Sequence, residues 1–414
     1  MAPFRGLRYD PERISSLAAV TSPPYDVVAP DDQLRLEDAD PHNIVRLILP
    51  RPEPTAEDGY RHAARLLQQW QQQGVLRPDP RPALYVYEQS QDGVVQRGLI
   101  AALAVSDPGA GIVLPHEDVM PRPVADRVGL MRTTKANLEP LLLTYRGDGR
   151  AAAVVEAAAA TEPLLTTTTS DGTRHRLWAV TNPAQLAAVS GDLATCRALI
   201  ADGHHRWAMY RRLQREHRYL AQSPWDWGMV LLVDTARYPL QVRAIHRVLR
   251  QLPLDQALGR LGPEWTTTAL ADSLPEALKA LASAKAEGLN AFLLADHDRR
   301  LLLTTHQAHL RLSAELPAEL PEDYLRLDAT VLHSLLLDRI WNVPDDPEHI
   351  GYLHDADAAV REAGRDGGTA VLLHPVEEGV VRRLAERGIT MPRKSTSFGP
   401  KPASGLVLRS LLLD

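Results

Sequence analysis

The residues best suited to chemistry in this sequence form the segment Asp202–Arg206, which reads DGHHR. An apolar run before it predicts a strand at 197–201, and the residues after it predict a helix at 207–217. The N-terminus of a helix presents unpaired backbone N–H groups and a partial positive charge, so anions bind there. Gly203 has no side chain and would let a phosphate approach the backbone closely. The segment therefore predicts a phosphate-binding turn between a strand and a helix.

The side chains of this turn suggest a role for each residue. Arg206 offers a planar fork of N–H donors that suits phosphate oxygens. His204 and His205 add donors that could also move a proton near neutral pH, and Asp202 could hold Mg²⁺ or orient a histidine. The two histidines could instead bind zinc, although helical zinc ligands usually lie four residues apart. The simplest alternative is an ordinary glycine turn followed by a solvated helix start.

A loop predicted at 114–127 supplies candidate catalytic carboxylates. A hydroxyl that attacks a phosphoryl group needs a positioned base, usually a carboxylate, and the transferred group needs cations and usually Mg²⁺. Glu117 is the predicted base and Asp126 the second candidate, and either could instead bind Mg²⁺ through oxygen. Arg127 would bind phosphate and offset developing charge, while His116 is a candidate substrate contact. The alternative for each is a charged side chain on a solvated loop.

The segment Met391–Lys401 (MPRKSTSFGPK) combines cations, hydroxyl groups and prolines. This composition is typical of a rigid loop that contacts an anion. Lys394 and Lys401 would act as point charges, and Ser395 and Thr396 would act as hydroxyl donors. Apolar residues follow and predict a final strand that ties the tail down. A solvated C-terminal loop is the alternative.

Two further pairs of residues are candidate substrate contacts. Tyr25 and Asp26 lie in a turn fixed by prolines, where Asp26 could bind a substrate amine or simply cap the turn. His246 and Arg247 follow a strand predicted at 240–245 and could face the site.

Seven stretches of the sequence carry a family resemblance: PPYDVV (23–28), LPHEDVMPRPVADR (114–127), ANLEPLL (136–142), DGTRHRLW (171–178), ADGHHR (201–206), IHRVL (245–249) and MPRKSTSFGPKPASGLV (391–407). Together they resemble a bacterial and archaeal family catalogued as domain-of-unknown-function family 1015, whose name conveys no activity. Separately, DGHHR between a strand and a helix resembles the signature of the ParB/sulfiredoxin-like superfamily, in which a Gly-x-x-Arg turn binds nucleotide phosphates. Within that superfamily the motif is similar to that of free serine kinases, which phosphorylate L-serine to O-phosphoserine.

The second resemblance implies a small-molecule kinase that transfers a phosphoryl group from ATP or ADP, with Mg²⁺, to free L-serine or a related hydroxy amino acid. This chain is much longer than the small serine kinases, so the resemblance does not locate the base. A nucleotide-gated switch without turnover is one alternative. A metal-dependent hydrolase built on His116, His204 and His205 is another. The sequence leaves the oligomeric state open, with a homodimer as one option.

The elements that must position these residues are those of a mixed α/β protein, and the resemblance implies a ParB/sulfiredoxin-like nucleotide-binding core with added α/β segments. Three regions are expected: 1–160 supplies loops, 161–255 carries the DGHHR turn and 256–414 carries the basic loop. Helices are predicted at 57–73, 151–160, 207–217, 274–287, 328–340, 356–363 and 377–387. Strands are predicted at 43–49, 83–89, 94–105, 166–169, 174–180, 197–201, 229–233, 240–245, 289–295, 300–304 and 370–374.

Composition excludes several other classes of protein. The 414 residues carry 46 basic and 52 acidic side chains, so the net charge is −6. An acidic chain without a basic stripe is not expected to bind nucleic acid or a membrane surface. Cys196 is the single cysteine, which excludes an intrachain disulfide and a cysteine-based zinc cluster. The N-terminus does not look like a signal peptide and no apolar run could span a bilayer, so a cytoplasmic location is expected.

Overall fold

The computed structural model describes residues 1–147, 149–219, 223–270, 273–305 and 320–413. The chain forms two compact units, each assembled from separate stretches of sequence. The first comprises Met1–Pro115, Val119–Leu240 and Pro400–Asp414, and the second comprises His116–Asp118 and Gln241–Gly399. The boundary predicted at residue 160 falls within the first unit, whose main sheet takes strands from both sides of it. The division into three regions stays a prediction.

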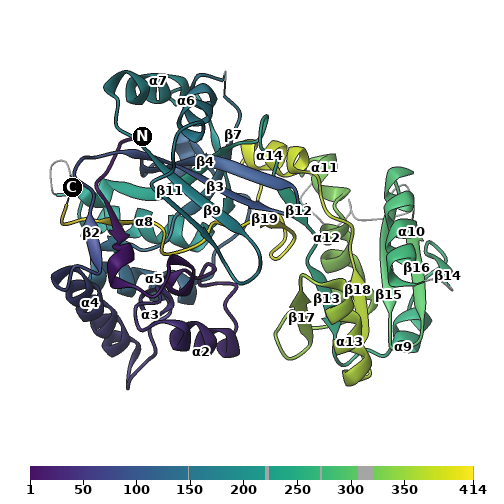
Figure 1. The fold of residues 1–414 in the computed structure, drawn as a ribbon. Helices are drawn as coiled ribbons and strands as arrows, with labels where there is room; N and C mark the ends of the chain where they lie inside the picture. Colours follow the sequence, from purple (N-terminus) through teal and green to yellow (C-terminus); the bar gives the residue numbers. More distant parts are fainter. Residues whose placement is uncertain (148, 220–222, 271–272, 306–319, 414) are drawn as a thin grey trace. The chain divides into compact units, whose positions relative to one another are not determined.

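The first unit is organised around an eight-stranded sheet with the order β5-β10-β7-β11-β4-β3-β9-β8. Figure 1 labels β3, β4, β7, β9 and β11 of this sheet. The strand that leads into the DGHHR turn, β10, is an interior strand, parallel to β5 and antiparallel to β7. Every residue of β7 and β10 is buried, so these strands show a continuous apolar run rather than alternation. In sheet order the strands are Val113–Leu114, Ala198–Asp202, Leu141–Tyr145, Trp227–Asp234, Val94–Ala104, Leu84–Gln91, Arg174–Val180 and Leu165–Thr168.

Helices pack on this sheet through two apolar clusters. Alanine and valine side chains of α6 (Arg150–Ala159) and α7 (Pro183–Leu193), which lie next to each other in Figure 1, pack on β3, β4 and β9. Larger side chains of α5 (Pro121–Thr134) and α8 (His204–Glu216), including Trp207, pack on β7, β10 and β11. Helix α8 is thereby fixed against the strand that precedes it, so the turn between them is held from both sides.

Both ends of the chain meet in a second sheet of the first unit, with the order β2-β1-β20-β6. The N-terminal strand β1 (Gly6–Tyr9) pairs antiparallel with the C-terminal strand β20 (Leu408–Ser410). This pairing returns the chain from the second unit to the first and carries Lys401 with it. The other strands and the helices of this region are β2 (Leu76–Pro78), β6 (Ala136–Asn137), α1 (Leu17–Val20), α2 (Pro30–Ala39), α3 (Val45–Ile48) and α4 (Ala56–Gln72).

The second unit is built on a six-stranded sheet with the order β14-β16-β15-β18-β13-β17, in which all neighbours are antiparallel. Alternate residues of β15 and β18 enter two clusters, so the sheet is covered on both faces. In sheet order the strands are Thr266–Leu270, Arg300–Thr305, Asn290–Ala295, Thr369–Leu372, His246–Leu249 and Ile350–Leu353. A further ribbon pairs β12 (Gln241–Arg243) with β19 (Ser397–Gly399).

The helices of the second unit divide between the two faces of its sheet. Helices α10 (Leu274–Ala286) and α13 (Ala356–Asp366) contribute to one cluster, and α9 (Leu254–Gly259) contributes to the other. The remaining helical segments are α11 (Glu322–Leu325), α12 (Asp328–Val331), a π-helix (Leu332–Ile340) and α14 (Glu378–Glu386). Across the chain, short 3₁₀ turns occur at Pro11–Arg13, Pro108–Ala110 and Pro224–Asp226.

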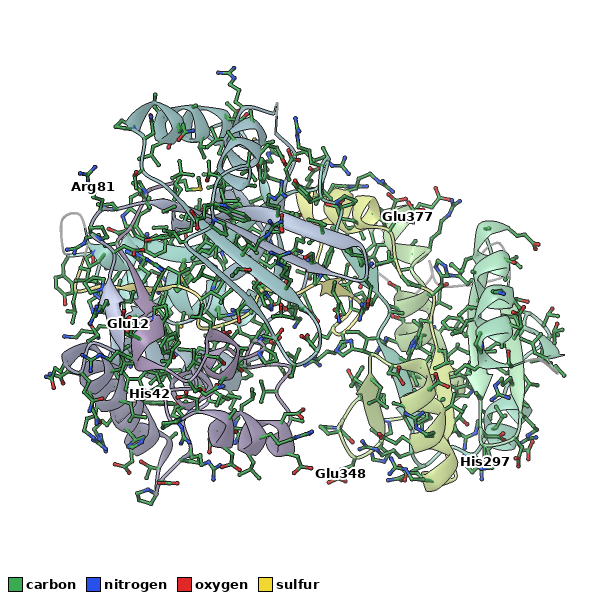
Figure 2. All side chains as sticks on the ribbon, viewed as in Figure 1. Glu12, His42, Arg81, His297, Glu348 and Glu377 are labelled. Carbon is green, nitrogen blue, oxygen red and sulfur yellow. The ribbon has the colours of Figure 1, made fainter. Side chains whose placement is uncertain are left out.

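The surface carries charged side chains that project outward from the ribbon, such as those of Glu12, Arg81 and Glu348 (Figure 2). Among the described residues, no helix combines the length and the apolar character needed to cross a membrane.

The mixed α/β class is confirmed, and the hairpins predicted at 83–105 and 166–180 are the pairs β3–β4 and β8–β9. The strand predicted at 43–49 is wrong, because this segment forms the helical turn α3. Asn43 Oδ1 accepts the N–H of Val45 at 2.9 Å, and Leu49 N–H donates to the carbonyl of Val45 at 2.8 Å. A short apolar run fits either a buried strand or a buried helical turn, and periodicity alone does not separate the two.

Three further boundaries differ from prediction. Asp126 and Arg127 lie on α5 rather than in a loop, because a proline suits the first turn of a helix, where its missing N–H is not needed. Helix α8 begins at His204, three residues before the predicted start. The strand predicted at 240–245 is replaced by the separate strands β12 and β13, with His246 and Arg247 opening the second one.

Candidate active site

The turn between β10 and α8 requires a glycine at its centre. Gly203 has φ +98°, in the left-handed region that favours glycine. A Cβ atom there would lie 3.0 Å from Leu141 and 3.1 Å from Nε of Arg206, which is tighter than normal packing. The first N–H bonded within α8 is that of Trp207, which donates to the Gly203 carbonyl at 2.9 Å. The preceding N–H groups therefore have no carbonyl partner within the helix, as expected at a helix start.

Arg206 is buried beneath this turn, with 4 % of its surface exposed. It donates from Nη1 to the Pro140 carbonyl and from Nη2 to Oδ2 of Asp202, each at 2.7 Å. Burial lowers the pKa of Arg206, but the nearby carboxylates of Glu139 and Asp202 outweigh it, so the pKa is raised overall. The guanidinium is thus a fixed part of the interior. A phosphate contact from Arg206 stays a prediction that its burial does not favour.

The space beside Arg206 is small. A cavity of about 30 Å³ borders Arg206, Arg127 and Glu139, together with apolar residues of α5 and α8. That volume is about what one water molecule needs. This cavity is therefore too small to hold a nucleotide.

Lys401 joins two carboxylates at the same turn. Its Nζ donates to Oδ2 of Asp26 and to Oδ1 of Asp202, each at 2.7 Å. Burial lowers the pKa of Lys401, but attraction by Asp202 and Asp26 outweighs it and raises the pKa. Lys401, Asp26 and Asp202 were each predicted from separate segments, and the structure brings them into direct contact.

This arrangement decides how well Asp202 fits the predicted Mg²⁺ site. One oxygen of Asp202 accepts from Lys401 and the other from Arg206. Mg²⁺ prefers carboxylate oxygens that are open to it and keeps several waters. Asp202 therefore does not fit as a magnesium ligand while Lys401 holds this position. Within the described stretches, no group of three or more His, Cys, Asp or Glu side chains could hold a metal ion.

Tyr25 lies between the cations of the site. Its ring centre is 4.2 Å from Cζ of Arg127 and 5.8 Å from Cζ of Arg206. Burial raises the pKa of the Tyr25 hydroxyl to about 12, although both arginines act to lower it. Its backbone N–H donates to Oε1 of Glu139 at 2.9 Å. Tyr25 therefore holds the Asp26 turn against the β10–α8 junction.

Glu139 is a site residue that the sequence reasoning missed. Its side chain is buried and also accepts a hydrogen bond from Oγ of Ser404 at 3.0 Å. Burial raises the pKa of Glu139, while Arg206 and Arg127 act to lower it. The available signal was a single acidic residue in the apolar stretch ANLEPLLL, where an ionisable side chain needs a buried partner.

Asp126 and Arg127 are engaged with each other and with the protein interior. Arg127 donates to Oδ2 of Asp126 from Nε at 2.9 Å and from Nη2 at 2.6 Å, and its Nη1 donates to the Ile48 carbonyl at 2.6 Å. Asp126 also accepts from the hydroxyl of Tyr60 at 2.6 Å. These contacts suit a structural link between α5, α3 and α4, and the catalytic role of Asp126 stays a prediction.

The two histidines of the turn differ in environment. His204 is buried, and burial together with the neighbouring His205 lowers its pKa to about 3, so the ring is neutral at pH 7. His205 is partly exposed, and its Nε2 accepts the backbone N–H of Met120 at 3.1 Å. Of the pair, His205 is the better placed to meet a ligand at the helix start.

A second group of predicted residues meets in the second unit. Oε1 of Glu117 accepts the backbone N–H of Lys394 at 2.6 Å. His116 accepts the N–H of Met391 through its carbonyl at 2.8 Å, and its ring Nε2 lies 3.0 Å from the hydroxyl of Thr396. The loop with the predicted base and the basic segment are therefore in contact although about 280 residues separate them.

The basic segment also borders a larger cavity of the second unit. This cavity has a volume of about 470 Å³, and its wall includes Ser395 and Met391 together with Lys285 and Asp328. Lys285 donates to Oδ1 of Asp328 at 2.8 Å. Ser395 uses its hydroxyl to donate to the Pro392 carbonyl, and Lys394 is exposed. Their phosphate roles stay predictions.

His246 and Arg247 are buried at the start of β13. Arg247 donates to the Ile245 carbonyl and its Nη2 lies 3.0 Å from Nε2 of His333, while its Cζ lies 5.3 Å from the ring centre of Tyr352. His246 accepts the N–H of Leu373 through Nδ1 at 3.3 Å. Their substrate-binding role stays a prediction.

Several of the predicted site residues thus form two groups, one within each unit, and Glu139 joins the first. The group of the first unit, called the Lys401 network below, consists of Tyr25, Asp26, Arg127, Glu139, Asp202, Gly203, Arg206 and Lys401. The group of the second unit consists of His116, Glu117, Lys394 and Thr396.

Comparison with known proteins places the chain in a family. A sequence profile described as "Protein of unknown function (DUF1015)" matches residues 1–330, which is most of the chain. The chain belongs to this family. The DUF1015 description names no activity, and no curated protein matches the chain.

Several solved structures are similar to this DUF1015 protein at low identity. A free serine kinase in complex with AMP is 14% identical, covers 72% of this chain and 87% of its own, and has a TM-score of 0.35. A conserved hypothetical protein from Pyrococcus furiosus is 14% identical over 76% and 97%, with a TM-score of 0.38. SbnI with a C-terminal truncation from Staphylococcus aureus is 10% identical over 76% and 89%, with a TM-score of 0.39. These scores are too low to transfer an activity, and the ParB/sulfiredoxin-like core stays a prediction.

Proposed function

We propose that this protein transfers a phosphoryl group from ATP or ADP to the hydroxyl group of free L-serine or a related hydroxy amino acid. The observation that carries this proposal is the position of Lys401. Its ammonium group contacts Asp202, the residue directly before Gly203 and the N-terminus of α8. A cation next to the N-terminus of a helix is the combination that binds phosphate oxygens.

We assign parts in this reaction to several residues of the Lys401 network. The N–H groups at the start of α8 and the ammonium of Lys401 bind phosphate oxygens, for which Lys401 gives up one of its carboxylate contacts. Asp26, about one-third exposed, is then free to bind the ammonium group of the amino acid. Arg206 keeps Asp202 and the turn in place from below, and does not touch the nucleotide. Mg²⁺ that arrives with the nucleotide would neutralise phosphate charge.

In the transfer step, the substrate hydroxyl oxygen forms a bond to the terminal phosphorus, and the bond from that phosphorus to the bridging oxygen breaks. ADP leaves when ATP is the donor, and AMP leaves when ADP is the donor. The hydroxyl proton passes to a carboxylate. Asp26 is the candidate base within the Lys401 network, and Glu117 stays the base predicted from the sequence; both are at least partly exposed.

Product formation by the purified protein tests the proposal. ATP or ADP with Mg²⁺ is incubated with L-serine, L-threonine or L-homoserine, and ³¹P NMR and mass spectrometry detect a phosphorylated amino acid. Formation of O-phosphoserine or a homologue supports the proposal, and its absence with every pair overturns it. Calorimetry that shows nucleotide binding without turnover would instead favour the nucleotide-gated switch.

Two lysine variants test the role of Lys401. Lys401→Met is expected to weaken nucleotide binding about tenfold to hundredfold, because a charge-assisted hydrogen bond is lost. The matched control is Lys279→Met, since Lys279 is exposed and pairs with Glu276 on the same helix. Equal affinity of Lys401→Met and Lys279→Met for ATP and ADP would exclude a phosphate contact by Lys401.

The same assay separates the two candidate bases. Asp26→Asn and Glu117→Gln are compared for kcat and KM over a range of pH. The base variant is expected to lose at least about a hundredfold in kcat and the low-pH limb of the profile. A variant that only weakens amino-acid binding is expected to raise KM instead.

A further inference from the structure

The backbone next to Lys401 is held by two buried glutamine side chains. Gln89 on β3 and Gln96 on β4 face each other in the strand register. Nε2 of Gln89 donates to the Pro400 carbonyl at 3.1 Å, and Nε2 of Gln96 donates to the same carbonyl at 3.0 Å. Nε2 of Gln89 also donates to Oε1 of Gln96 at 2.5 Å. Both amides thus converge on the residue directly before Lys401.

The burial of these glutamines argues that their contact matters. Gln89 and Gln96 are only 2 % and 3 % exposed. A buried amide costs free energy unless it is hydrogen-bonded, so an apolar pair would pack here more simply. Both amides donate to the same backbone carbonyl, and we infer that they hold the backbone at Pro400 in one position.

A second contact holds the backbone after Lys401. The hydroxyl oxygen of Tyr87, also on β3, accepts the N–H of Ala403 at 3.2 Å. The same hydroxyl lies 2.9 Å from Nδ1 of His175, and burial lowers the pKa of His175 to about 4. A neutral imidazole can accept the Tyr87 proton, which leaves the Tyr87 oxygen to accept from Ala403. Tyr87 and Gln89 lie two residues apart and share one face of the strand.

We propose that Gln89, Gln96 and Tyr87 are positioning residues that fix the backbone on both sides of Lys401, so that its ammonium stays between Asp26 and Asp202. This inference rests on the proposed function, in which that ammonium binds phosphate. A lysine side chain has four rotatable bonds and many conformations, so a fixed backbone reduces the freedom that must be lost on binding. The three residues act through Lys401 and do not touch the nucleotide.

Lysine NMR tests the inference without any assay of activity. The chain contains five lysines, so ¹⁵N,¹³C-lysine labelling gives few ammonium signals, and the Lys401→Arg variant assigns the one from Lys401. An ammonium signal that persists near neutral pH requires a held, hydrogen-bonded group. Gln96→Met keeps the length of the side chain and removes its amide, and it is expected to abolish the Lys401 signal. The control is Gln91→Leu, because Gln91 lies on β3, the strand that pairs with the strand of Gln96, and donates to the Asp171 carbonyl instead.

Further readouts keep the test decisive. The other lysine signals and circular dichroism show whether Gln96→Met has folded. If it has not, Tyr87→Phe replaces it, since that change removes only a hydroxyl group. An unchanged Lys401 signal in a folded Gln96→Met or Tyr87→Phe protein overturns the inference. A lost signal in either variant, with Gln91→Leu unchanged, supports it.

Nucleotide titration connects the positioning residues to function. Gln96→Met is expected to weaken ATP and ADP binding about threefold to tenfold, the scale of one hydrogen bond, while Gln91→Leu matches the wild type. Failure of the wild-type protein to form any phosphorylated amino acid would overturn the proposed function. The lysine NMR result would still decide whether these residues hold Lys401.

Discussion

Two buried arginines, one in each unit, share most of their surroundings. Arg206 is 4 % exposed and Arg247 is 0 % exposed. Each donates to a backbone carbonyl, and each lies within 6 Å of the ring centre of a tyrosine, Tyr25 for Arg206 and Tyr352 for Arg247. Sequence alone assigned both to a binding site.

The difference between them is the second partner of the guanidinium. Arg206 donates to the carboxylate of Asp202, and Glu139 lies nearby, so its pKa is raised. The second partner of Arg247 is the ring of His333, and burial lowers the pKa of Arg247 to about 10. Burial lowers the pKa of both arginines, but the net shift is upward only for Arg206, where carboxylates outweigh the burial.

The comparison distinguishes a buried arginine that stabilises the fold by pairing with a carboxylate from one that has no such pairing. Arg206 contacts Oδ2 of Asp202 and acts on the buried Glu139, while Lys401 and Arg127 supply the other positive charges next to these acids. Arg247 neutralises no carboxylate by direct contact among the described residues. Removal of one partner from a buried ion pair is costly, whereas replacement of a buried charge that has no opposite partner can be neutral.

The largest expected effect follows removal of Arg206. Arg206→Leu removes the cation that contacts Oδ2 of Asp202 and one of the two arginines that act on Glu139, so the free energy of unfolding should fall by about 3–5 kcal/mol. Denaturant unfolding followed by circular dichroism measures the change, and hydrogen exchange shows whether β10 and α8 lose protection first. Arg206→Lys is the control, since it keeps the charge and loses part of the geometry, and its loss should be intermediate. A loss below about 1 kcal/mol for Arg206→Leu would contradict the structural role.

Acid stability sharpens the comparison through a histidine in each unit. Burial lowers the pKa of His204 to about 3, and burial together with Arg247 lowers that of His333 to about 4. The unfolded chain binds a proton at each near pH 6.5 and the folded chain does not, so stability falls as pH drops from 6.5 toward these values. Each histidine contributes a slope of up to about 1.4 kcal/mol per pH unit.

Glutamine substitutions separate the contribution of these histidines to the pH dependence of stability from that of the carboxylates. His204→Gln and His333→Gln should each flatten the loss of unfolding free energy between pH 6.5 and pH 4.5, measured by denaturant titration at several pH values. His297→Gln is the control, because His297 is exposed and Asp298 raises its pKa, so no flattening is expected. Identical pH profiles for wild type and His204→Gln would mean that His204 is not held neutral in the folded protein.

Local patterns predicted the elements around these residues well. The sequence from 198 to 216 contains an apolar run, a glycine and a helical segment, and the structure has β10, the Gly203 turn and α8 there. Residues that form one strand and one helix interact with near neighbours, so their pattern is readable from the chain alone. Asn43–Leu49 was misread, because a single buried turn lacks the length that would show a period.

The contacts of the candidate site were harder to predict, because they are non-local. Asp26 and Asp202 meet through Lys401, which lies 375 residues beyond Asp26 in the chain. Nothing in the DGHHR segment shows that Arg206 turns inward, since that depends on the Pro140 carbonyl and on Glu139. One compositional signal was available: lysine occurs only five times, and two of these residues fall between 394 and 401.

The smallest expected effect is that of Arg247→Met, and it tests the other half of the comparison. Methionine is an unbranched side chain that fills similar space. The substitution removes the guanidinium, whose hydrogen-bond partners are the Ile245 carbonyl and the His333 ring rather than a carboxylate. Burial lowers the pKa of Arg247, which means that the folded protein disfavours its positive charge. Removal of the charge therefore stabilises the fold, and this gain offsets the loss of two hydrogen bonds. The free energy of unfolding should therefore stay within about 1 kcal/mol of wild type, measured by the same denaturant titration as for Arg206→Leu. A loss as large as that of Arg206→Leu would show that Arg247 also neutralises a buried anion, and burial rather than the carboxylate would then be the common cause.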